Sequence, residues 1–458
     1  MNNYLRRKFY FRHVTFVLIV FCYMPSHHLR AQEPPTRKHS NVARLQLARL
    51  KAVHEDVQLY AQKRKYIPIA EGLKDFRCIM HAHAEDSTHT AGTLPEMLRD
   101  AQVAGVHAIL LSDHYRPPRD FIDGRWRGLK DGVLFIPGSE ARGFLLHPVR
   151  SILPRMELQT NELIETVTMD DGLIFLSHIE ERQDHRLEGL TGLEIYNRHY
   201  DAKRDMGSLL AVAMMLTDPK ALEQLQEAVE KYPAELFAFQ CDYPEVYLKK
   251  WDEGTRSLRL TGIAANDCHH NQVMLVKKVD DQTALLGTNV DQDKDMRKVT
   301  AALRPGLKQL LKDKEPGEVA VRVDLDPYLI SFRNSCTHIL APKLDEMAIR
   351  NALKAGHVYV SHDWMCDATG FQFYAQAGKH HAMMGDLISF EDGITLKTSL
   401  PVPAYLRLIR HGVEIARVEN SDHWSYPIEE AGTYRLEAWL MLDGEYRPWI
   451  YSNPIYIK

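Results

Sequence analysis

The chain has 458 residues, of which 45% are hydrophobic and 26% are charged, and its formal net charge at pH 7 is −4. This is an ordinary globular composition, with enough apolar residues for more than one core. The near-neutral charge gives no argument for nucleic acid or an anionic membrane as the main partner.

Residues 1–31 have the pattern of a secretory signal peptide. A basic start at residues 6–8 is followed by an apolar run at residues 14–24. That run is too short to cross a bilayer, which needs about 20 residues. Cleavage after Ala31 leaves a mature chain without a transmembrane span, so we expect an exported protein, periplasmic or secreted. An uncleaved N-terminal anchor is the alternative.

Residues 32–75 are predicted to form a linker and an N-terminal helix. Residues 32–40 are polar, and apolar residues then recur at helical spacing between residues 41 and 63. We expect this helix to pack on the outside of a main domain that covers residues 76–369. Five scattered cysteines follow Ala31, and an odd number cannot pair completely into disulfides.

From residue 76 onward, apolar strands alternate with helices, which indicates βαβ units and a parallel sheet. Thr93-x-x-Glu96 predicts a capping box for a helix over residues 94–104, and Gly105 predicts its end. A second helix is expected over residues 161–169 and several helical pieces over residues 205–250. The predicted strands cover residues 76–80, 106–111, 133–136, 173–176, 192–196 and 258–264.

Polar side chains of the metal-ligand type follow most of these strands. In a closed (β/α) barrel the C-terminal strand ends converge on one face, where active sites form. An open doubly wound sheet places its site near one switch point, so a spread over five or six strands favours a barrel. No G-x-G-x-x-G or Walker sequence follows a strand, which argues against a nucleotide cofactor. These side chains are His81, His83, His114, Glu140, His178, Asp267 and His269.

The last part of the chain has a different character. Residues 275–320 are charged and weakly patterned, and residues 328–363 are expected to complete the barrel. After residue 370, short apolar strands are joined by turn sequences such as His411-Gly412 and Asp443-Gly444. We predict a small antiparallel β-sandwich over residues 370–458, with a structural or docking role.

The stretch His81-Ala82-His83 is the first candidate for metal binding. Alternate residues of a strand share a face, so the two imidazoles can point the same way. Histidine and carboxylate sites without thiolate suit zinc, manganese or iron. A lone H-x-H is more often part of a polar loop, so the later strand ends decide the interpretation.

The ordered motif set resembles the PHP family, named after polymerase and histidinol phosphatase. The resemblance is firm over residues 76–275 and weaker as far as about residue 365. The run from Pro448 to Pro454 resembles the sandwich appended to some exported PHP hydrolases, including a carbaryl-hydrolase-like branch. The motifs are His81-Ala82-His83, His89, Ser112-Asp113-His114, Gly138-Ser139-Glu140, Ser177-His178 and Asp267-Cys268-His269.

The resemblance implies an α/β protein with a distorted (β/α)7 TIM-like barrel and two or three divalent metal ions. It implies a hydrolase that uses a metal-bound hydroxide, with Glu140, Asp267 and His178 as catalytic residues. One of the implied ligands, His147, precedes Pro148 and could equally cap a loop and not bind metal. The implied ligands are His81, His83, Glu140 and Asp267 for a first metal; Glu140, His147 and His178 for a second; and His89, His114 and His269 for a third.

Arginines near the predicted ligands suit a phosphate, so the expected substrate is a small-molecule phosphate ester. Arg116 follows His114 by two residues and Arg142 follows Glu140 by two, although loop arginines can also be merely solvated. The same site could instead hydrolyse a carbamate, ester or amide. A further alternative is a non-catalytic binding protein. For Glu194 and Asp86 the sequence leaves open whether they support the ligands.

Overall fold

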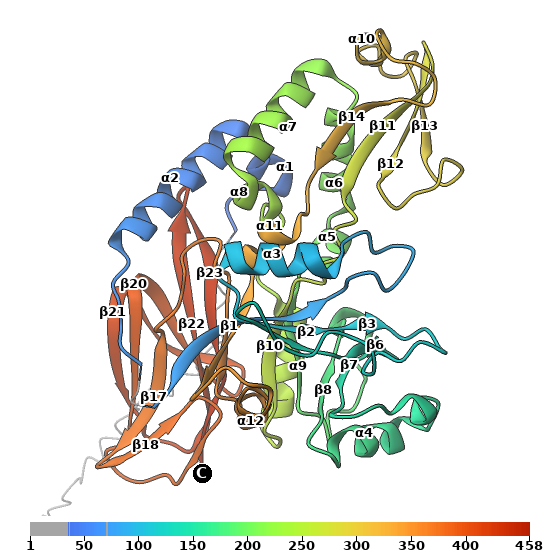
Figure 1. Ribbon diagram of the computed structural model, residues 1–458. Coiled ribbons are helices and arrows are strands. Elements are labelled where there is room, and N and C mark those ends of the chain that lie inside the picture. The colour runs from blue at the N-terminus through green and yellow to red at the C-terminus, as the bar shows by residue number, and fades with distance from the viewer. Residues whose placement is uncertain (1–34, 36, 70–71) are drawn as a thin grey trace, which may run out of the picture.

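The computed structural model describes residues 35, 37–69 and 72–458 (Figure 1). The predicted signal peptide, residues 1–31, lies outside the described residues. Within the part of the chain that is described, no helix is long and apolar enough to cross a membrane. The fold is mixed α/β.

Parallel strands carry the predicted ligands. In one sheet, β1 (Lys74–Ala82), β2 (Ala108–Leu111) and β5 (Val133–Ile136) pair in parallel, and β4 (Gly128–Lys130) pairs antiparallel to β5. In a second sheet, β8 (Leu173–Leu176), β9 (Gly192–Asn197) and β10 (Thr261–Ala265) pair in parallel. Apart from the start of β1, their buried and mainly apolar sequences are those expected of strands covered on both faces.

The two sheets are joined at both ends. β3 (Asp113–His114) and β6 (Ser139–Ala141) directly follow β2 and β5, but pair with each other in the second sheet. β7 (Phe144–His147) then runs antiparallel to both β6 and β8. At the other end, a parallel bridge joins Ala82 to Cys268. These pairings gather the C-terminal strand ends, while the (β/α)7 barrel as such stays a prediction.

Helices cover these sheets. The helix predicted over residues 94–104 is confirmed: the Thr93 side chain accepts a hydrogen bond from the Glu96 N–H, and Gly105 ends the helix with φ 70°. The helices of the main domain are α3 (Leu94–Ala104), α4 (Thr160–Thr168), α5 (Arg198–Arg204), α6 (Met206–Met215), α7 (Pro219–Lys231), α8 (Pro233–Phe237), α9 (Glu245–Thr255), α11 (Tyr328–Asn334) and α12 (Glu346–Ala355), with 3-10 turns at Leu153–Arg155 and Ile179–Glu181.

The weakly patterned region 275–320 is an ordered antiparallel sheet, visible at the upper right of Figure 1. Its strands mix buried apolar residues with exposed charged ones without a regular alternation, which is why the sequence signal is faint. The strand order is β13-β12-β11-β14. The elements are β11 (Val273–Asp280), β12 (Thr283–Thr288), β13 (Arg297–Thr300), α10 (Leu307–Leu311) and β14 (Val319–Asp324).

The C-terminal strands continue the first sheet. β15 (Cys336–Ala341) pairs antiparallel with β1, β16 (Val358–Ser361) with β15, and β23 (Glu445–Ser452) with β16. Residues 328–363 therefore link the main sheet to the C-terminal strands and add no parallel strand. The remaining strands are β17 (Gln372–Ala377), β18 (His380–Met383), β19 (Leu387–Ile388), β20 (Thr395–Arg410), β21 (Val413–Pro427), β22 (Gly432–Leu442) and β24 (Ile455–Ile457). The domain boundary at residue 370 stays a prediction.

The N-terminal helices pack on the C-terminal strands. α2 (Leu47–Lys63) lies beside β22 and α8, and α1 (Asn41–Arg44) contacts α2 and α6 (Figure 1). Arg44 forms a buried ion pair of 2.8 Å with Glu445. A buried pair of this kind fixes geometry more than it adds stability, because both charges lose water.

Asn453 joins the C-terminal strands to the parallel sheet. Its side chain accepts from the Gly262 N–H at 2.8 Å and donates to the Gly262 carbonyl at 3.0 Å, and it is fully buried. We expect Asn453→Ala to lower the free energy of unfolding by about 2–4 kcal/mol, because two buried backbone groups lose their partners. The exposed Asn161→Ala is the control, expected within about 0.5 kcal/mol of the parent in urea denaturation. Equal stability of both variants would contradict this role.

Candidate metal centre

The strand ends open into a pocket of about 570 Å³ lined by predicted ligands and by α5 and α6. These side chains lie near the ends of strands, where the strand fixes the backbone: His81, His114 and Glu140 lie within β1, β3 and β6, and the others lie in the turns that follow strands. Predicted ligands that line the pocket directly are His89, His114, Glu140, His178, Asp267 and His269, and His81 and His83 lie buried beneath them.

The first group of donors combines two imidazoles and two carboxylates. His81 Nε2 lies 3.0 Å from His83 Nε2, and each of these nitrogens lies 3.3–3.7 Å from Glu140 Oε2 and Asp267 Oδ1. Ligand atoms around a tetrahedral ion at 2.0–2.1 Å are about 3.4 Å apart. The spacing therefore fits one divalent metal ion.

Two further carboxylates orient these rings. His81 Nδ1 lies 2.7 Å from Glu194 Oε1, and His83 Nδ1 lies 2.9 Å from Asp86 Oδ2. A carboxylate can only accept, so each Nδ1 carries the hydrogen and each Nε2 presents its lone pair to the centre. Two lone pairs that face each other at 3.0 Å repel unless a proton or a metal ion lies between them.

The second group lies on the other side of the same two carboxylates. His178 Nε2 is 3.0 Å from Glu140 Oε1 and 3.6 Å from Asp267 Oδ2, and His199 Nδ1 is 3.8 Å from Asp267 Oδ2. Glu140 and Asp267 thus each offer one oxygen to each group. Shared carboxylates of this kind are how two-metal sites are held together.

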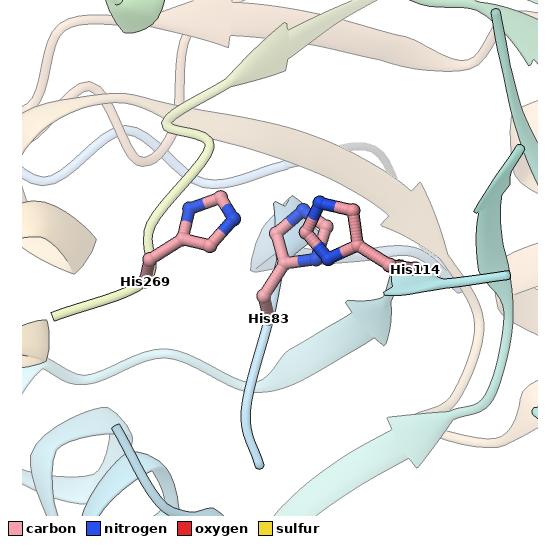
Figure 2. A group of neighbouring side chains, drawn as sticks. All are labelled: His83, His114 and His269. Atoms are coloured by element: carbon pink, nitrogen blue, oxygen red, sulfur yellow. The ribbon is translucent and has the colours of Figure 1, made fainter. Parts of the chain in front are cut away.

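The third group consists of His89, His114 and His269. His89 Nε2 lies 3.2 Å from His114 Nε2, and Asp86 Oδ2 orients His114 through its Nδ1 at 2.7 Å. His269 Nε2 is buried and has no hydrogen-bond partner among the described residues. Figure 2 shows the rings of His83, His114 and His269 gathered together from three separate segments. The ring nitrogens of His83, His114 and His269 lie within 4.8 Å of one another, so His83 stands between the first and third groups.

Burial and neighbouring charges shift the pKa values in this cluster. Burial, reinforced by His83, lowers the pKa of His269 to about 3, which keeps the ring neutral as a metal ligand must be. Burial opposes the charged form of His178, but hydrogen bonds to Glu140 and Glu180 outweigh it and raise its pKa to about 10. Protons therefore compete with any cation for this side of the centre.

His147 is not part of the cluster. β7 runs antiparallel to β6, so His147 lies beyond the Ser139–Leu146 pair, beside Gly138 and away from Glu140. Its Nδ1 is 3.4 Å from the Pro137 carbonyl. His147 was predicted as a ligand because it lies in an apolar run shortly after Glu140, but the antiparallel direction of β7 carries it away from that carboxylate.

The predicted substrate arginines also differ from expectation. Arg142 points away from the pocket, because its guanidinium donates to the carbonyls of Met156 and Leu158 and so fixes the loop before α4. Arg116 is exposed and does not line the pocket. The role of Arg116 in binding substrate stays a prediction. For Arg142 the structure shows a different role, since its guanidinium holds the loop before α4 in place.

The structure adds three functional candidates to the predicted set. His199 follows β9, and its Nδ1 lies 3.8 Å from Asp267 Oδ2 on the side of the centre where His147 was expected. Arg198 and Lys203 line the pocket from α5. The predicted helical region began at residue 205, after α5, so no prediction placed these two side chains at the pocket.

Comparisons with known proteins find a distant structural similarity. No family model matches the chain, and no curated protein matches it. Among solved structures, the chain is similar to a two-domain protein of Bacteroides vulgatus that contains a predicted PHP-like metal-dependent phosphoesterase. The identity is 13%, the TM-score is 0.31, and the alignment covers 85% of this chain and 98% of that chain. These values are too low to assign the activity, so the interpretation depends on the site itself.

The cluster predicts at least two divalent ions per metal-supplemented chain, measured by elemental analysis. Asp267→Ala should lose at least one ion, because both of its oxygens face imidazoles. His199→Ala should lower the occupancy of the second group. His147→Ala is the control and should leave the metal content per folded chain unchanged. Fewer than two ions in the parent, or a loss only in His147→Ala, would contradict these assignments.

Asp86 links the first and third groups, since its Oδ2 accepts from both His83 and His114. We expect Asp86→Asn to weaken metal binding by roughly 10- to 100-fold. The amide can turn its NH2 group toward one of the two rings, and that ring then loses the hydrogen bond that orients it. Competition with a chelating dye measures the affinity. The exposed neighbour variant Glu85→Gln should bind metal like the parent. Parent-like affinity in Asp86→Asn would show that the carboxylate does not position the rings.

Proposed function

We propose that this chain is an exported, metal-dependent hydrolase of the PHP type, and that it acts on phosphate esters. The observation that carries the proposal is the position of Glu140 and Asp267, whose paired oxygens face imidazoles on both sides. The ordered motifs that resemble the PHP family supply these same residues. The distorted barrel and the carbaryl-hydrolase-like subtype are part of the proposal.

The residues fit a centre of two or three divalent ions such as zinc, manganese or iron, held by histidine and carboxylate ligands. When bound, such ions polarise a phosphoryl group and lower the pKa of water, which supplies a nucleophile near neutral pH. The chain orients the ligands through Glu194 and Asp86 and keeps His81 and His83 away from bulk water. Glu140, Asp267 and His178 stand closest to the reacting groups.

The position of Arg198 favours a phosphate ester as the substrate over an uncharged acyl compound. It lines the pocket, is 6% exposed, and its Nε has no hydrogen-bond partner among the described residues. Its guanidinium packs over the Phe237 ring at 4.7 Å, which holds the plane in place. A fixed guanidinium presents paired donors that match phosphate oxygens.

The proposal predicts that metal-supplemented protein hydrolyses nitrophenyl phosphates and that chelation abolishes the activity. Arg198→Met keeps the apolar stem and should lower kcat/KM for phosphate esters about 10- to 100-fold, the worth of one charged hydrogen bond. The exposed Arg186→Ala is the control and should match the parent.

A panel of carbamates, acyl esters and amides separates the alternatives. Turnover of these substrates without turnover of phosphates would replace the phosphoesterase by an acyl hydrolase. Full metal loading without turnover of any substrate would favour a binding protein.

A further inference from the structure

One face of α6 is apolar and largely uncovered. Met206, Leu210 and Met214 are 64%, 51% and 39% exposed, and they recur at i, i+4 and i+8. Residues at this spacing share one face of a helix. An apolar face left in water at the mouth of a pocket indicates a surface that binds something.

This face begins inside the pocket of the metal centre. Met206 and Leu209 line that pocket, together with Arg198 of α5. In Figure 1, α5 and α6 rise from the strand ends toward the four-stranded sheet of β11–β14. The start of the apolar face is therefore continuous with the place where the phosphoryl group is proposed to bind.

The same face continues into a second hollow of about 370 Å³. Leu210 and Met214 form one wall of this hollow, and Leu286 of β12 and Val299 of β13 form the other. From Met206 to Met214 the helix rises by roughly 12 Å at 1.5 Å per residue. The two pockets are thus consecutive along one helix, and we call them, together with the α6 face that lines both, the apolar groove.

We propose that the substrate is a phosphate ester of a long apolar alcohol, whose chain lies along α6 between this helix and β12–β13. This inference rests on the proposed phosphoesterase function. Water forms the new bond to phosphorus, the ester P–O bond breaks, and the departing oxygen takes a proton, giving the free alcohol and inorganic phosphate. The groove holds the chain while Arg198 and the metal centre hold the phosphate.

The shape of the apolar surface on α6 fits an extended alkyl chain better than a flat membrane. A helix that lies on a membrane presents a protruding apolar face. The face of α6 instead opens toward the opposing side chains of β12 and β13, which form a second wall. Three basic residues border the hollow and form no ion pair with a described residue: Arg297, Lys298 and Arg304. Because these cations could bind anionic lipid headgroups, an anionic membrane is the rival occupant.

The test compares ethyl, butyl and octyl phosphate below micellar concentrations, with phosphate release by the metal-supplemented full chain as readout. A methylene that leaves water completely is worth about fourfold, so kcat/KM should rise roughly two- to fourfold for each methylene. Leu210→Asp and Met214→Asp should lower the octyl-to-ethyl ratio at least tenfold. Met347→Asp, which changes a helical methionine of 49% exposure on α12, should keep the parent ratio.

The outcomes separate this inference from the proposed function. Hydrolysis of ethyl phosphate with no gain from chain length overturns the inference and leaves the phosphoesterase intact. If neither ester is hydrolysed, the proposed function fails, and calorimetry with ethyl- and octylphosphonate tests the inference by binding alone. Equal affinities for the two phosphonates overturn the inference. Tighter binding of octylphosphonate that is lost in Leu210→Asp supports it. Loss of binding to phosphatidylglycerol vesicles in Leu210→Asp, with an unchanged ester ratio, assigns the surface to a membrane and overturns the inference.

Discussion

The carboxylates of Glu140 and Asp267 stand between imidazoles on two sides, and the rest of the site depends on this arrangement. His81 and His83 cannot present Nε2 lone pairs to each other at 3.0 Å unless a proton or a metal ion lies between them. Their Nδ1 atoms are already held by Glu194 and Asp86, so the rings have no other way to turn. Positive charge at the centre is therefore a requirement of the fold and not only of the chemistry.

The scaffold holds this centre by its strand ends and by strained turns. His178 and Asp267 both have left-handed backbone, with φ of 47° and 51°, which costs about 1–3 kcal/mol for a residue with a side chain. The cost is sustained because β8 and β10 are buried and paired in parallel on both sides of β9. The C-terminal strands contribute as well, since Asn453 ties them to β10 through Gly262.

The sequence predicted most of the side chains that the structure gathers at the strand ends, because they occur near strand ends in a recognisable order. It failed at His147, because β7 runs antiparallel to β6, and it assigned no role to His199. Arg142 illustrates a second limit: closeness in sequence to Glu140 did not predict that its guanidinium turns toward loop carbonyls. The apolar face of α6 was also invisible, because a hydrophobic helix reads as buried until its neighbours are known.

The most direct test of the account is anomalous diffraction from crystals of the metal-supplemented protein. The account predicts separate metal peaks on the two sides of Glu140 and Asp267, one beside His81 and His83 and the other beside His178 and His199. A peak on one side only, or no peak within reach of both carboxylates, would contradict the central claim of a shared multinuclear centre.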